Sequence, residues 1–161
     1  MSIINRHNTA AGNDLLKTAE HVLVEQQLTF NEFMQSIKLY VSELVDTDNE
    51  DFVQSVLFFC HMLDSPDKHL DILQTLLMNP NHFQHGEIIR ILQDVGSEKS
   101  ISYLLEAIAL KPALSYLDYD DYGAYYKKCL WALTAIGTEE AKVVISFFTG
   151  SPVPELWEQA V

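Results

Sequence analysis

Six histidines and two cysteines are the first side chains of this sequence to consider as metal ligands, and the cysteines are also candidate nucleophiles. His82 and His85 are three residues apart, the spacing of two metal ligands on one helical turn. They stand where a helix is expected to begin, however, and no H-E-x-x-H motif accompanies any histidine. His61 and His69 flank an expected turn and belong to no recognised metal-binding motif. The sequence therefore predicts no metal site.

The residues that would support catalysis by a nucleophile or on a phosphate do not form a recognisable motif. Cys60 and Cys129 lie in apolar stretches outside any C-x-x-C pair, so both are expected to be buried and reduced. The six glycines are scattered and form no phosphate-binding loop. No local signature joins a serine or cysteine to a histidine and a carboxylate. We therefore predict a protein that is not an enzyme and uses no cofactor.

Two acidic segments, 46–51 and 116–122, are the most unusual parts of the sequence. Seven acids and no Lys or Arg occur from 39 to 67, and the second segment interleaves aspartates with tyrosines. Tyrosine offers rigid contact area and carboxylates pair with Lys or Arg, although helix capping and inward packing are the structural alternatives for single residues. The predicted partner-binding residues are Asp46, Asp48, Glu50, Asp51, Tyr116, Asp118, Tyr119, Asp120, Asp121, Tyr122 and Tyr125.

The charge balance favours a basic protein as the partner. Ten Lys and Arg face 23 Asp and Glu in 161 residues, so the formal net charge is −13. Direct nucleic-acid binding needs a basic face and is disfavoured, whereas an acidic surface steers a basic protein towards it. No apolar run approaches the roughly 18 residues of a membrane span, and residues 1–14 are polar, which predicts no signal peptide or anchor. We expect a soluble, cytoplasmic protein.

Helical periodicity runs through most of the chain, and strand signals are almost absent. Thr29 and Glu32 have the spacing of a capping box, and Ser65 precedes a proline at a helix start. Eight principal helices are predicted, caps included, at 14–27, 29–45, 50–63, 65–77, 82–95, 97–110, 122–136 and 138–148. Tight turns between most of them imply antiparallel neighbours.

An internal repeat organises the second half of the chain. Aligning Gly96 with Gly137 gives a period of 137 − 96 = 41 residues, in which Leu92 matches Leu133 and a hydroxyl residue and Glu follow each glycine. This pattern resembles HEAT-like repeats over 88–148. The resemblance implies an all-α, HEAT-like α-solenoid of about four antiparallel hairpins, forming a single domain over 1–161. Some HEAT-like proteins are DNA glycosylases or bilin lyases, and the acidic charge disfavours the glycosylases.

In a stacked solenoid, the loops between hairpins lie along one edge. The two acidic segments contain two of these loops, so we expect an acidic, tyrosine-rich edge to be the contact surface. A concave face is the alternative surface, with residues such as Asp71, Gln74, Ser102 and Glu106.

These features predict an immunity protein or antitoxin of the small bacterial type, which neutralises a basic toxin domain, a nuclease, by occluding its active site. A monomer is favoured. The alternative is a non-catalytic scaffold or chaperone subunit that uses Phe52, Val56 and Phe59 as an assembly face. A dimer is one form of this alternative. A HEAT-like lyase is a third reading.

Overall fold

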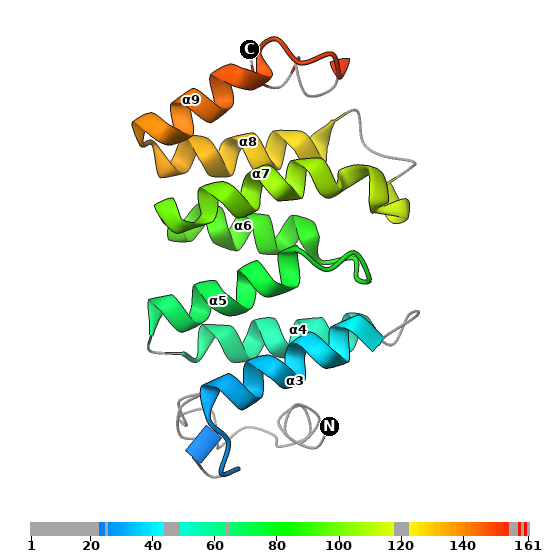
Figure 1. Ribbon diagram of the computed structural model, residues 1–161, viewed down its shortest axis with the longest axis vertical. Helices are drawn as coiled ribbons and strands as arrows, with labels where there is room; N and C mark the ends of the chain where they lie inside the picture. The colour runs from blue at the N-terminus through cyan, green and yellow to red at the C-terminus, as the bar shows by residue number, and fades with distance from the viewer. Residues whose placement is uncertain are drawn as a thin grey trace. The chain divides into compact units, whose positions relative to one another are not determined.

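The computed structural model describes residues 23–24, 26–43, 49–63, 65–117, 123–154, 158 and 160, apart from the side chains of 43, 49 and 50. These residues form seven α-helices and no strand (Figure 1), which confirms the prediction of an all-helical protein. The predicted helix over 14–27 lies largely outside the described residues. The α-helices are α3 (Phe30–Glu43), α4 (Asn49–His61), α5 (Pro66–Leu77), α6 (His85–Val95), α7 (Ile101–Leu110), α8 (Ala124–Ile136) and α9 (Glu139–Phe148).

The chain divides into two compact units, unit 1 (Met1–Gln84) and unit 2 (His85–Val161). Helix α3 of unit 1 begins at the predicted capping box. The amide of Glu32 donates to Thr29 Oγ1 at 3.2 Å, and the Thr29 amide donates to the Glu32 carboxylate at 2.8 Å. These reciprocal bonds satisfy two amides that the first turn leaves without helical partners. The Thr29 amide and, at 2.7 Å, the Thr29 hydroxyl both donate to the Glu32 carboxylate and lower the pKa of Glu32.

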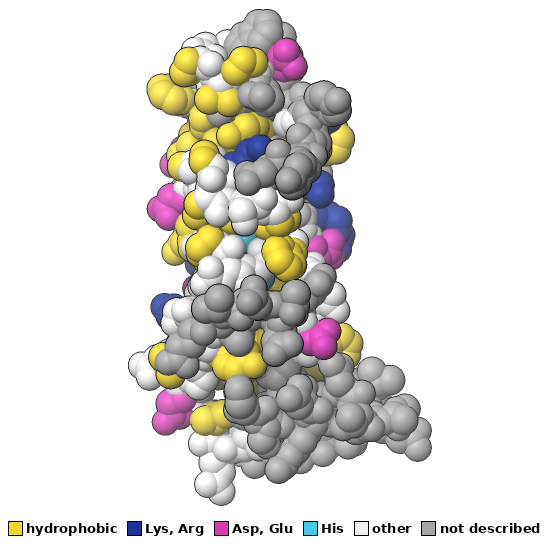
Figure 2. Space-filling view, turned by 90° about the vertical axis from the view of Figure 1, so that its right-hand side faces the viewer, with side chains coloured by type: hydrophobic (Ala, Val, Ile, Leu, Met, Phe, Trp, Pro, Cys, Tyr) yellow, Lys and Arg dark blue, Asp and Glu magenta, His cyan; other side chains and the backbone are white. Residues whose placement is uncertain are grey.

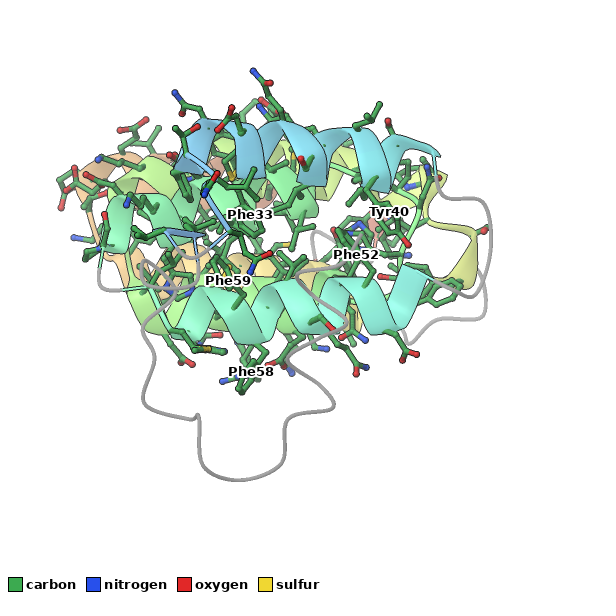
Figure 3. All side chains as sticks on the ribbon, turned by 90° about the horizontal axis from the view of Figure 1, so that it is seen from below. Phe33, Tyr40, Phe52, Phe58 and Phe59 are labelled. Atoms are coloured by element: carbon green, nitrogen blue, oxygen red, sulfur yellow. The ribbon has the colours of Figure 1, made fainter. Side chains whose placement is uncertain are left out.

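Aromatic side chains join α3 to α4 in unit 1. The Phe33 and Phe59 rings lie 4.7 Å apart between centroids, and the Tyr40 and Phe52 rings lie 4.1 Å apart. Figure 3 shows these four side chains in the space between the two helices. Helix α5 packs against both α3 and α4, and its Leu73 is completely buried. Burying such apolar side chains is the main source of stability where these three helices pack together.

Helix α5 begins and ends as the sequence predicts, but the next helix begins three residues late. Ser65 Oγ accepts from the Lys68 amide at 3.5 Å, and proline follows as the first helical residue. Helix α6 begins at His85 and not at the predicted residue 82. His82 is buried instead, with its Nε2 2.8 Å from the Leu76 carbonyl oxygen and its Nδ1 accepting from the Gln84 amide at 3.1 Å. A ring that bonds both flanking segments holds the connection in a non-helical path.

The two bonds of His82 require the neutral ring with its proton on Nε2, because Nδ1 accepts from an amide. Burial lowers the pKa of His82 below its usual 6.5, and the bond to Leu76 opposes this only in part. The unfolded chain therefore binds more protons below about pH 6.5, so acidification must destabilise the fold.

We expect the free energy of unfolding to fall as the pH drops from 7.5 through 6.5, by at most about 1.4 kcal/mol per pH unit from His82. His82→Gln keeps a donor for Leu76 but cannot titrate, so the stability gap between wild type and variant should shrink on acidification. Urea denaturation of both proteins at several pH values measures this gap. Lys38→Gln, at an exposed position of α3, is the control. A gap that is constant with pH would contradict the prediction.

Unit 2 contains two helical hairpins whose turns are nearly identical. Gly96 and Gly137 have φ values of 61° and 71°, a left-handed conformation that side chains with a Cβ adopt with strain. The Gly96 amide donates to the Leu92 carbonyl at 3.0 Å, and the Gly137 amide donates to the Leu133 carbonyl at 3.3 Å. Residues 41 positions apart thus make the same helix end, as the repeat predicts.

The second helices of these hairpins begin differently. Thr138 Oγ1 accepts from the Ala141 amide at 3.3 Å, and α9 follows directly. Ser97 Oγ accepts instead from the Lys99 amide at 3.3 Å, and a 3-10 turn (Glu98–Ser100) precedes α7. Helix α8 contacts α6, α7 and α9 (Figure 1), so the neighbouring hairpins of unit 2 pack on each other. Ile88, Leu92, Leu104, Cys129 and Leu133 are completely buried in this unit.

Candidate protein-binding surface

The first acidic segment leads into α4. Asp46 and Asp48 lie outside the described residues. The backbone of Glu50 is in the first turn of α4, and its side chain is outside the described part of the structure. Asp51 is exposed in that same turn. Carboxylates here stabilise the helix through its dipole, and an exposed one is also accessible to a basic partner.

The second acidic segment begins at a tyrosine that is bonded inward. Tyr116, in a 3-10 turn (Ser115–Leu117), is half-buried, and its hydroxyl lies 3.0 Å from Nδ1 of the completely buried His85. The two rings are roughly parallel, with centroids 5.8 Å apart. This pair anchors the start of the segment to the first turn of α6. The remaining predicted contact residues of the segment, Asp118, Tyr119, Asp120, Asp121 and Tyr122, lie outside the described residues.

Tyr125 is a core residue, whereas the sequence analysis assigned it to the contact surface. Its side chain is 2% exposed, and its hydroxyl donates to the Ala107 carbonyl at 3.2 Å. Burial raises the pKa of Tyr125, which keeps the phenol neutral. Tyr126 on the same helix is also buried. The structural alternative, that tyrosines on this helix pack inward, holds for both residues.

Burial also removes residues from the concave face and from the assembly face, the two surfaces predicted as alternatives to the acidic edge. Gln74, assigned to the concave face, is 6% exposed, whereas Asp71, Ser102 and Glu106 are exposed. The assembly face proposed for a scaffold faces the interior of unit 1. Val56 and Phe59 are buried and Phe52 is half-buried, two of them against α3, as the ring contacts show. These three side chains therefore cannot form an exposed face.

The exposed face of α4 lies opposite its core face. Asp51, Gln54, Phe58 and His61 are all exposed and, at about 100° per residue, fall within one narrow arc of the helix. Val53, Val56 and Cys60 are completely buried on the other side. Figure 3 shows Phe58 pointing away from α3 while its neighbour Phe59 points inward. We call these four exposed residues the α4 outer face.

Phe58 is a surface residue that the sequence analysis missed. With 51% of its side chain exposed, it contrasts with the almost fully buried Phe59 beside it. The helix is so apolar that no single stripe stands out, and the sequence alone leaves open which phenylalanine faces the core. The buried spacing 53, 56, 60 is the signal that identifies residue 58 as outward.

The structure shows the surroundings of His61, His69, Cys60 and Cys129. Among the described residues, no group of three or more His, Cys, Asp or Glu could hold a metal ion. His61 and His69 make an edge-to-face ring contact at 5.8 Å, and burial followed by repulsion from His61 lowers the pKa of His69. Cys60 and Cys129 are buried free thiols, as predicted, and burial raises the pKa of both. High thiol pKa values disfavour nucleophilic chemistry.

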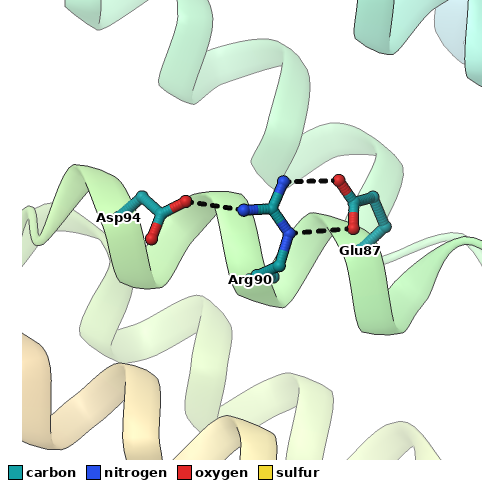
Figure 4. Close-up of polar contacts among 3 residues, drawn as sticks. All are labelled: Glu87, Arg90 and Asp94. Atoms are coloured by element: carbon teal, nitrogen blue, oxygen red, sulfur yellow. Dashed lines mark hydrogen bonds and ion pairs between the residues drawn. The ribbon is translucent and has the colours of Figure 1, made fainter.

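Several cations of unit 2 have partners inside the unit. Arg90 lies between two carboxylates of α6, bonding Glu87 at 2.7 Å and Asp94 at 2.8 Å (Figure 4). Lys127 lies over the exposed Trp131 ring, 4.9 Å from its centroid, and Lys142 pairs with Glu139 at 2.6 Å. Such local contacts are modest in energy at exposed sites.

The acidic side chains of the described residues are dispersed on the face of the molecule that Figure 2 shows. On the face in Figure 2, described acidic side chains stand singly among hydrophobic and polar ones and form no continuous patch. No described helix has the length and hydropathy required to cross a bilayer. Comparisons with known protein families, with curated proteins and with solved structures found no match.

Proposed function

We propose that this chain is a small acidic binding protein, of the immunity or antitoxin type, that neutralises a basic toxin domain. The observation that carries the proposal is the segment 39–67, which has seven acids and no Lys or Arg, with Asp51 exposed at the start of α4. A protein surface of one sign selects partners of the opposite sign and speeds their encounter.

The favoured partner is a nuclease domain. Enzymes that cleave nucleic acid have a basic groove because their substrate carries one negative charge per phosphate. An acidic protein that docks in this groove excludes the substrate by occlusion and needs no catalytic group of its own. The aspartates at 118, 120 and 121 would contribute carboxylates that stand in for phosphates.

The proposal extends to the architecture and location of the protein. The two hairpins of unit 2, with matching glycine turns 41 residues apart, support a HEAT-like solenoid of about four hairpins. We also propose that the protein acts as a monomer in the cytoplasm. The buried positions of Val56 and Phe59 count against the scaffold alternative in the form that uses them as an assembly face.

Co-expression with the product of the neighbouring reading frame tests the function. We expect that product to end in a basic domain, to stop growth when expressed alone, and to be harmless when this chain is present. Purified together, the two proteins should form a complex that weakens as the salt concentration rises. Growth arrest that this chain does not relieve, or a neighbouring frame without a basic domain, would contradict an immunity function.

A further inference from the structure

Phe58 and Trp131 are exposed to a similar extent, and a lysine lies over the Trp131 ring, whereas no cation of the described residues lies over Phe58. Three lysines of the described residues lie over aromatic rings: Lys68 over Phe30 at 5.3 Å, Lys111 over Tyr126 at 5.1 Å and Lys127 over Trp131 at 4.9 Å. Within the part of the chain that the structure describes, no such contact is made to Phe58, although half of its side chain is exposed.

The charge of the surrounding sequence explains this difference. No Lys or Arg occurs between 39 and 67, so α4 and its flanks supply no cation to the outer face. Asp51 lies seven residues before Phe58 and is exposed on the same side of α4. An electron-rich ring face and a carboxylate thus stand about 10 Å apart along the helix axis, at 1.5 Å per residue.

We propose that the α4 outer face docks an arginine-bearing surface of a basic protein, with Phe58 as its aromatic anchor. A guanidinium lies flat on the Phe58 ring, as arginine does on aromatic faces in proteins, and a second cation pairs with Asp51. This proposal rests on the proposed function, because it names the contact by which a basic partner is recognised. Arginine is preferred over lysine here because its planar, weakly hydrated head group stacks on a ring.

Other occupants of this face fit its charge poorly. A second copy of the chain, docked through the same face about a two-fold axis, would bring two acidic, base-free segments together. Anionic lipid surfaces and nucleic acids are repelled by the same acids. A neutral apolar segment could cover Phe58 but would leave Asp51 without a cation. A basic protein surface satisfies both residues.

Two labelled peptides, one of nine arginines and one of nine lysines, test the proposal. Each is titrated with the full chain at about 0.15 M salt and followed by fluorescence anisotropy. We expect wild type to bind the arginine peptide more tightly than the lysine peptide. Phe58→Ala should weaken arginine binding by about two- to fivefold, the effect of one exposed cation–π contact, and leave lysine binding nearly unchanged. Phe58→Leu, which keeps apolar bulk without the ring electrons, should behave like Phe58→Ala.

The controls separate this contact from charge alone and from misfolding. Phe147→Ala removes a more exposed phenylalanine, 78% exposed on α9, and should retain the arginine preference. Asp51→Lys should weaken both peptides. Circular dichroism reports whether each variant keeps its helical signal.

Equal binding of the arginine peptide by wild type and both Phe58 variants overturns the proposal, as does a dimer in sedimentation that Phe58→Ala converts to a monomer. Absence of binding to either peptide also overturns it. These outcomes are independent of the co-expression experiment. If the Phe58→Ala variant neutralises the toxin and binds it with unchanged affinity, Phe58 is not the anchor, but the immunity function is still supported.

Discussion

Replacing Leu92 or Leu133 by alanine should lower the free energy of unfolding by about 2–5 kcal/mol in either case. Both side chains are completely buried, and both precede a left-handed glycine by four residues. Alanine removes three carbon atoms from a packed site and leaves a cavity that rigid helix neighbours fill only in part. Because the two leucines occupy equivalent positions of the repeat, we expect effects of similar size. Urea denaturation followed by circular dichroism measures both.

The matched control is Leu39→Ala, at a position of α3 that is 59% exposed. We expect this change to alter the free energy of unfolding by no more than about 0.5 kcal/mol. A loss below about 1 kcal/mol for either Leu92→Ala or Leu133→Ala would show that the hairpins of unit 2 pack less tightly than their burial indicates.

Reversing three charges of the second acidic segment, with Asp118, Asp120 and Asp121 all changed to lysine, should weaken binding to the basic product of the neighbouring reading frame about a hundredfold or more. Each change removes an attraction and introduces a repulsion, and like charges placed against each other in an interface cost several kcal/mol. The helical signal should be unchanged. Isothermal titration calorimetry at two salt concentrations measures the loss in affinity.

A second triple variant controls for net charge. Glu98, Glu140 and Glu158 are exposed acids of unit 2 outside the predicted surface, and their change to lysine shifts the net charge by the same amount. We expect this variant to lose only severalfold in affinity, an effect that salt largely screens. Equal losses in the two triple variants would mean that overall charge and not the segment determines binding.

The helices could be predicted from the sequence because their ends are specified locally. Thr29 with Glu32, Ser65 with its proline, and Gly96 and Gly137 all act within about four residues, and each forms the predicted contact. The late start of α6 could not be predicted in the same way. It depends on His82 finding the Leu76 carbonyl six residues away, which only the folded chain brings within reach.

The candidate surface was less predictable than the helices. Tyrosine is suited both to a core with a hydrogen-bond acceptor and to an interface, and the Ala107 carbonyl that captures Tyr125 lies 18 residues away in the sequence. Phe58 and Phe59 are adjacent and chemically identical, so only the packing of α4 distinguishes them. The exposed position of Asp51 agrees with the prediction of an accessible carboxylate, and its role in binding stays a prediction.

The glycine turns of unit 2 bear on how such a chain can change over evolution. Each turn closes through a hydrogen bond from the glycine amide to a carbonyl four residues earlier, so the residues that specify the turn lie within one short stretch of sequence. A duplicated 41-residue segment would carry a working turn with it. The length of the array can therefore grow or shrink by whole hairpins through copying or deletion of genetic material, without the invention of new loop chemistry.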